Sequence, residues 1–130
     1  MTTLNGRILG QAERATRAVL DRLLERSGTT FEQWVAINLT AAESLTRAEL
    51  VARMATGLRA DPSLVAAVVE DAALFTGDIT LTALGRERHD AISAGIDEIT
   101  AALYGGLTPE ELDVAGRVLL QVTDRANALV

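Results

Sequence analysis

The fold of this chain is decided by residues 78–85, which read DITLTALG. Polar and apolar side chains alternate over residues 78–82, which is the period of a half-buried β-strand. Directly after Thr82 the apolar residues change to helical spacing and stand at Leu84, Ala91, Ile92, Ile96, Ile99 and Leu103. The sequence therefore predicts a short edge strand that leads into a long helix over about residues 83–104, which ends before Gly105 and Gly106.

The sequence predicts further helices on both sides of this stretch. Ala, Leu, Arg and Glu recur at helical spacing, and aromatic residues make up only 3% of the chain. The predicted helices cover about residues 6–27, 30–42, 47–57, 62–75 and 108–128. No repeat, low-complexity stretch or linker separates them, so we expect a single, mainly α domain over residues 1–130.

Capping signals mark where these helices begin and end. A threonine followed three residues later by glutamate can form a capping box, in which each side chain bonds the backbone N–H of the other residue. This spacing occurs at Thr29 and Glu32, at Thr46 and Glu49, and at Thr108 and Glu111. Asp61 before Pro62 predicts another helix start, and Gly28 is expected to end the first helix in a left-handed conformation.

The composition excludes several classes of protein. With 130 residues, 48% of them hydrophobic, the chain is long enough to bury a core. It has no cysteine and a single histidine, His89, so one chain cannot build a disulfide framework, a His/Cys metal cluster or a nucleophile triad. We therefore expect neither an enzyme nor a bound metal or cofactor. Without a signal-peptide core or an apolar run of roughly 20 residues, we expect a cytoplasmic protein with no membrane contact.

The charged residues are unevenly placed. The chain has 12 arginines, no lysine and 18 acidic residues, which gives a net charge of −6. Residues 61–113 hold two of the arginines and eleven of the acids. Affinity for nucleic acid comes largely from neutralising phosphates, so this acidity argues against nucleic-acid binding by that part of the chain.

Long apolar stripes run along the helices near both ends of the chain. In the last helix the stripe consists of Leu112, Ala115, Leu119, Val122 and Ala126. The first and the 83–104 helices carry comparable stripes. A chain of this length cannot cover three such faces alone, and we therefore expect a homodimer.

In combination, these motifs resemble the multiple antibiotic resistance regulator (MarR) family of winged helix-turn-helix transcription regulators. Residues 81–85, LTALG, match the family's Leu-Thr-x-x-Gly segment, which closes the wing and opens the long fifth helix. Residues 107–112, LTPEEL, resemble the start of the last helix, and residues 31–34, FEQW, resemble the start of the second. The resemblance covers essentially the whole chain.

The resemblance implies a distinct role for each part of the chain. Residues 6–27 and 108–128 would be the dimerisation helices, residues 30–82 the winged helix-turn-helix, and residues 83–104 the connecting helix. Residues 47–57 would support a recognition helix over residues 62–75. The implied function is a homodimer that binds a palindromic DNA operator and is released by a small ligand.

The sequence departs from the family pattern where DNA would be contacted. Residues 61–75 contain no Arg, Lys, Asn or Gln but three acids, and only residues 76–78 are left for the outer part of the wing. We therefore expect a reduced wing. The residues left to contact DNA are Thr46, Arg47, Arg53, Arg59 and Ser63. The alternative is that these arginines form a solvated face and pair with Glu49 and other acids.

The resemblance also implies a pocket for a small aromatic ligand between the dimerisation helices and the DNA-binding lobe. Trp34, Asn38 and His89 could reach it from the second and fifth helices. The alternatives are that Trp34 is a core residue and that His89 belongs to a polar helix turn.

Two functions therefore stay open. The first is a MarR-like homodimeric transcription regulator. The second is a degenerate winged-helix dimer that has lost strong DNA binding and serves as a ligand-binding or protein-interaction module.

Overall fold

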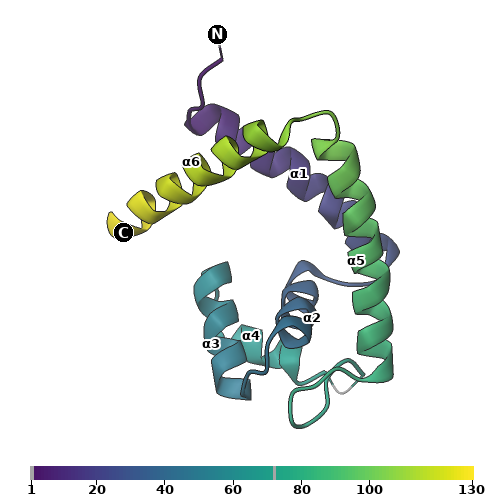
Figure 1. The fold of residues 1–130 in the computed structure, drawn as a ribbon. Helices are drawn as coiled ribbons and strands as arrows, with labels where there is room; N and C mark the ends of the chain where they lie inside the picture. Colours follow the sequence, from purple (N-terminus) through teal and green to yellow (C-terminus); the bar gives the residue numbers. More distant parts are fainter. Residues whose placement is uncertain (1, 72) are drawn as a thin grey trace. The chain divides into compact units, whose positions relative to one another are not determined.

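The computed structural model describes residues 2–71 and 73–130, and within them the chain is mainly helical, as predicted (Figure 1). The helices are α1 (Gly6–Arg26), α2 (Phe31–Ala42), α3 (Arg47–Leu58), α4 (Pro62–Val69), α5 (Ala83–Tyr104) and α6 (Pro109–Ala128). The chain divides within α5 into two compact units, Met1–Asp97 and Glu98–Val130. The single domain over residues 1–130 stays a prediction.

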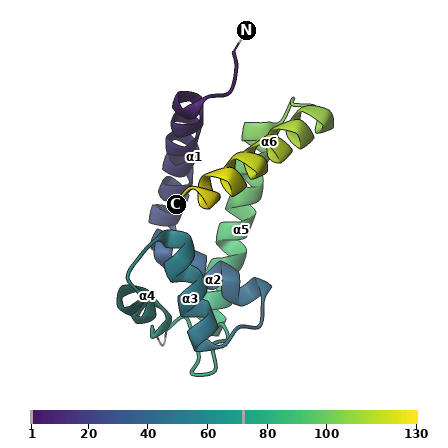
Figure 2. The same ribbon diagram turned by 90° about the vertical axis from the view of Figure 1, so that its left-hand side faces the viewer.

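In the first unit, α2, α3 and α4 pack against one another, and α1 contacts α2 (Figure 2). Their shared core consists of Trp34, Ala36, Ile37, Leu50, Met54, Val65 and Val69. Gly95 lets α5 approach α1, because a Cβ atom at this residue would lie 2.7 Å from Cδ1 of Leu23. Since Val65 and Val69 face the core, α4 turns its other side, with Leu64, outward.

The predicted capping boxes at Thr46 and Thr108 are confirmed, and Gly28 has the expected positive φ of 62°. The predicted box of Thr29 with Glu32 is wrong. Thr30 caps α2 instead and forms the box with Gln33. Thr29 is buried and its hydroxyl donates to the carbonyl of Ser27 over 3.1 Å, so it is not available to cap the helix.

The predicted fourth helix is too long at its C-terminal end. α4 ends at Val69, and Asp71 then begins a separate turn. The Asp71 carboxylate accepts a hydrogen bond from the backbone N–H of Ala73 over 3.0 Å, and the Asp71 carbonyl accepts one from Phe75 over 3.0 Å. This local capping competes with continuation of the helix. The part of the prediction that falls on residue 72 lies outside the described residues.

The strand predicted over residues 78–82 is also wrong. In the part of the chain that the structure describes, this region forms one antiparallel bridge, between Phe75 and Leu81. Ile79 has a φ of 55°, which a strand does not allow, although its side chain is buried. Thr76 closes the loop by donating its backbone N–H to the Thr80 carbonyl over 2.8 Å. Residues 76–80 therefore form a tight loop where the resemblance places the wing.

The LTALG segment has a physical role at the start of α5. The Thr82 hydroxyl donates to the carbonyl of Ala73 and accepts from the backbone N–H of Gly85 over 3.1 Å, so it joins the loop to the first turn of the helix. A Cβ atom at residue 85 would lie 2.5 Å from the carbonyl oxygen of Leu74. Threonine and glycine at these two positions therefore let the helix begin directly against the preceding loop.

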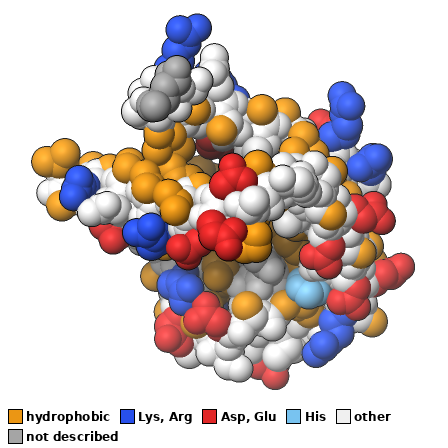
Figure 3. Space-filling view, turned by 45° about the horizontal axis from the view of Figure 1, so that its top comes forward, with side chains coloured by type: hydrophobic (Ala, Val, Ile, Leu, Met, Phe, Trp, Pro, Cys, Tyr) orange, Lys and Arg blue, Asp and Glu red, His pale blue; other side chains and the backbone are white. Residues whose placement is uncertain are grey.

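The second unit consists of the last turns of α5, a turn, and α6. Among the described residues, none within α6 is buried. Hydrophobic side chains gather along the helix (Figure 3), and its apolar stripe includes Leu112 at 38%, Leu119 at 37% and Val122 at 41% exposure. A unit of this size offers α6 no core of its own.

Candidate functional site

Two arginines of α3 lie beside glutamates at the ends of neighbouring helices. Nη1 and Nη2 of Arg53 contact Oε1 and Oε2 of Glu43 over 3.3 Å and 2.8 Å. This hydrogen bonding raises the pKa of Arg53. Nη1 of Arg47 lies 3.6 Å from Oε1 of Glu70. Glu43 is the C-cap of α2 and Glu70 the C-cap of α4, so each acid comes from an element adjacent to α3.

The third arginine predicted to contact DNA has different surroundings. Arg59 is the C-cap of α3, and its φ of 52° places it in the left-handed region. Its side chain is exposed and forms no ion pair within the described residues. A cation at the C-terminus of a helix is favoured by the helix dipole.

The two hydroxyl residues predicted to contact DNA both lie at helix N-termini. The Thr46 hydroxyl accepts the backbone N–H of Glu49 over 3.1 Å and keeps its own proton for another acceptor. The Ser63 hydroxyl donates to the Asp61 carboxylate over 2.6 Å. This hydrogen bond, followed by one from the Ser63 backbone, holds the pKa of Asp61 below its usual range. Ser63 can therefore offer only its oxygen lone pairs to a ligand.

The outward side of α4 is largely apolar. Leu64 is 70% exposed, and Ser63 and Ala67 are exposed beside it. None of these side chains can make a two-point hydrogen bond to the edge of a base.

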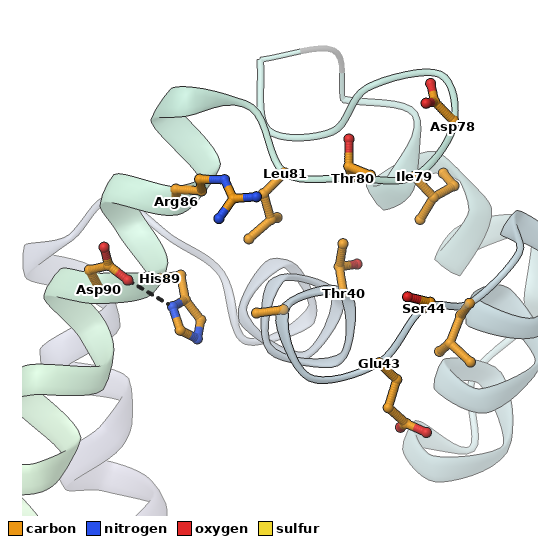
Figure 4. A pocket seen from close by; sticks show the side chains of 12 residues that line it. Thr40, Glu43, Ser44, Asp78, Ile79, Thr80, Leu81, Arg86, His89 and Asp90 are labelled. Atoms are coloured by element: carbon orange, nitrogen blue, oxygen red, sulfur yellow. Dashed lines mark hydrogen bonds and ion pairs between the residues drawn. The ribbon is translucent and has the colours of Figure 1, made fainter.

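A cavity of about 510 Å³ opens between the end of α2, the wing loop and the start of α5 (Figure 4). Arg86 and His89 extend from α5 toward Thr40 of α2 and Ser44 of the connection between α2 and α3. The Oγ1 atom of Thr40 is buried without a hydrogen-bond partner among the described residues. Because this oxygen is itself buried, a molecule in the cavity does not reach it unless the wall rearranges.

The residues predicted to line a ligand pocket lie in different surroundings. Trp34 is 7% exposed and stacks on His89, with 5.9 Å between the ring centroids. His89 lines the cavity, and its Nδ1 lies 3.1 Å from Oδ1 of Asp90. Asn38 is exposed and is not among the described residues that line this cavity. The structure thus brings Trp34 and His89 together and leaves Asn38 apart from the cavity.

Several neighbours of these residues were not predicted from the sequence. Glu43 and Glu70 are distant in sequence from the arginines they contact, and no local pattern signals either pair. The spacing of Arg86 and His89 is a usable signal, because residues three apart share one side of a helix. Thr40 gives no sequence signal, because what singles it out is an unmet hydrogen bond.

Two other kinds of site are absent from the described part of the chain. No group of three His, Asp or Glu side chains there is placed to hold a metal ion. No helix there is long and apolar enough to cross a membrane.

No protein-family model and no curated protein matches the sequence. Solved structures do match. A MarR family protein of Mycobacterium tuberculosis in complex with DNA has a TM-score of 0.70 and 24% identity, covering 93% of this chain and 98% of the other. Ligand-free NadR has a TM-score of 0.74 and 23% identity, with coverage of 97% and 98%. MepR of S. aureus in complex with DNA has a TM-score of 0.70 and 19% identity, with coverage of 98% and 97%.

This chain has the MarR fold. In each comparison the match extends over nearly the full length of both aligned chains. It therefore includes α1 and α6 as well as the helix-turn-helix. Within this fold, α3 and α4 are the helix-turn-helix pair, and the loop over residues 76–80 takes the place of the wing.

Proposed function

We propose that this chain is a homodimeric DNA-binding transcription regulator that a small ligand releases from its operator. The observation that carries the proposal is the full-length MarR fold, which the chain shares with two proteins solved on DNA, from M. tuberculosis and S. aureus. That likeness favours the regulator over the degenerate module. A regulator of this kind acts on DNA in the cytoplasm.

The apolar stripe of α6 supports the homodimer. Leu112, Leu119 and Val122 follow one another at helical spacing and are each more than a third exposed. A continuous apolar face of this length is rare on a monomer and marks an interaction surface. A second copy of the chain carries the same face, so a two-fold dimer can cover both at once.

The helix-turn-helix supports DNA binding through two kinds of contact. Arg47, Arg53 and Arg59 lie on or directly after α3, where their guanidinium groups can bind phosphates. The outward side of α4, with Leu64 and Ala67, would enter the major groove and meet base edges through apolar contact. Phosphate contacts then provide most of the affinity.

The cavity beside α5 supports release by a ligand. Its walls come from the wing loop, the α2–α3 connection and α5, so an occupant would contact the elements that flank the helix-turn-helix. The guanidinium of Arg86, which lines the cavity, suits an aromatic carboxylate. The M. tuberculosis protein has also been solved with salicylic acid.

Selection from a pool of random DNA duplexes tests the proposal. The full chain, incubated with the pool at low salt, is expected to enrich a palindromic sequence, because two related α4 helices meet two related half-sites. The Arg53→Gln/Arg59→Gln variant, which keeps α4 unchanged, is expected to enrich the same sequence more weakly. A pool that stays random through repeated rounds would contradict the proposed function.

A further inference from the structure

The two glutamates that hold Arg53 and Arg47 occupy positions that helix stability does not favour. Glu43 and Glu70 are the C-caps of α2 and α4, and the negative end of a helix dipole repels a carboxylate. Neither helix has a basic residue in its last turn to offset this repulsion. Each glutamate instead forms an ion pair with an arginine of α3.

The contact of Glu43 with Arg53 has the geometry of a phosphate contact. Two guanidinium nitrogens face two carboxylate oxygens, at 3.3 Å and 2.8 Å. Carboxylate and phosphate compete for this same fork of donors. Glu70 contacts Arg47 at one point only, where its Oε1 lies 3.6 Å from Nη1 of Arg47. Nη1 and Nη2 of Arg53 must therefore leave Glu43 before they can bind a phosphate in this way.

Both pairs are also open to exchange. The side chains of Arg53 and Glu43 are 50% and 45% exposed, and those of Arg47 and Glu70 are 45% and 66% exposed. Ion pairs in contact with solvent add little to the stability of a fold. Removing either glutamate is therefore expected to leave the helix-turn-helix folded.

We propose that Glu43 and Glu70 are affinity-determining residues that stand in for DNA phosphates on Arg53 and Arg47. In the free protein the two glutamates pair with the two arginines. When a duplex binds, its phosphates replace the glutamates in these contacts. The inference rests on the proposed DNA-binding function. It extends that function by identifying Glu43 and Glu70 as residues that lower the affinity for DNA without contacting a base.

A double-mutant cycle on the full chain tests this inference. Fluorescence anisotropy with the selected duplex at low salt would compare the parent chain with Glu43→Gln, Arg53→Gln and the combination of both. The Glu43→Gln variant is expected to bind about two- to fivefold more tightly, which is the range of an exposed pair. In the Arg53→Gln background the same substitution is expected to gain nothing, because its partner is gone. Glu70→Gln with Arg47→Gln repeats the cycle at the second pair.

The Glu32→Gln variant controls for the change in net charge, since Glu32 lies in the first turn of α2 and outside both pairs. It is expected to bind like the parent, and thermal melting of each variant checks its fold. Equal tightening by Glu32→Gln, or a gain by Glu43→Gln that persists without Arg53, would overturn the inference while leaving the proposed function intact. If the parent and the Glu43→Gln/Glu70→Gln variant both fail to bind any duplex, the proposed function fails as well.

Discussion

Gly85 is the residue where the start of α5 comes near the preceding loop. A methyl group there would lie 2.5 Å from the carbonyl oxygen of Leu74, a backbone atom, and 3.2 Å from Cδ2 of Leu81. We expect Gly85→Ala to destabilise the fold by about 1–3 kcal/mol, the usual cost of overpacking, as measured by urea denaturation.

Gly57 of α3 provides the matched control, because a methyl group there would meet nothing within 4 Å. Gly57→Ala is expected to stabilise the helix by about 0.5–1 kcal/mol. If Gly85→Ala proves as stable as Gly57→Ala, the explanation given for the LTALG segment is wrong.

The capping box of α3 predicts a dependence on pH. Hydrogen bonds from the backbone and side chain of Thr46 lower the pKa of Glu49 from its ordinary value of 4.5. A carboxyl whose pKa is lowered in the folded state stabilises that state above pH 4.5 and loses this contribution as the pH falls through the folded pKa.

The stability of the parent relative to Glu49→Gln is therefore expected to be greatest near neutral pH. Glutamine can form the same box, as Gln33 does with Thr30, but it does not titrate. The difference in melting temperature between the two proteins should shrink as the pH falls below 4.5. A difference that stays constant from pH 7 to pH 3 would contradict this assignment.

At the scale of single residues, the sequence predicts what depends on near neighbours. The boxes at Thr46 and Thr108 need only the right side chain three residues away. The choice between Thr29 and Thr30 depended on burial, which local spacing does not reveal. The partners of Arg47 and Arg53 depended on how α2, α3 and α4 pack, so Glu43 and Glu70 could not be predicted.

At the scale of elements, the outward side chains of α4 lead to a prediction about how the protein recognises bases. Its outward residues Ser63, Leu64 and Ala67 offer one hydroxyl, already bonded to Asp61, and two apolar side chains. Such a surface can distinguish bases through the methyl group of thymine. We expect that replacing thymine with deoxyuridine in the half-sites of the selected duplex, which removes only methyl groups, weakens binding several-fold.

The same replacement outside the half-sites serves as the control and is expected to leave the affinity unchanged. Leu64→Ala should remove most of the difference between the thymine and deoxyuridine duplexes. Equal affinity for both duplexes in the parent chain would show that α4 does not read thymine methyl groups.

At the scale of elements, the sequence predicted each helix and its start within about one residue, because caps and apolar periodicity are local. It failed for the described residues between the end of α4 and the start of α5. There Asp71 stops α4 early, and Ile79 takes a positive φ that its β-branched side chain disfavours. The alternation over residues 78–82 resembled a strand because Ile79 and Leu81 do turn inward, although from a loop.

For the whole molecule, the exposed stripe of α6 predicts a dimer. Light scattering is expected to give about twice the chain mass of 13.8 kDa. Leu119→Glu places a charge in the stripe and is expected to shift the protein toward the monomer. Leu120→Glu is the control, since Leu120 lies beside the stripe and is 69% exposed. A parent chain that stays monomeric at every concentration, or equal behaviour of the two variants, would contradict the role assigned to α6.

The overall charge could be read from the sequence, but its meaning for the proposed function depends on the fold. The count of −6 weighs against DNA binding. In the structure, two of the acids responsible lie on the arginines that would bind phosphate. The acidity therefore bears on how tightly the chain binds DNA as well as on whether it binds.

The central claim, that this chain binds DNA as a MarR-type regulator, is tested most directly by titrating the full chain against the duplex from upstream of its own coding region. Fluorescence anisotropy at low salt should give saturable binding at micromolar protein or below. The affinity should fall steeply as salt is added, because arginine–phosphate contacts release counterions. No change in anisotropy at low salt and micromolar protein would contradict the claim.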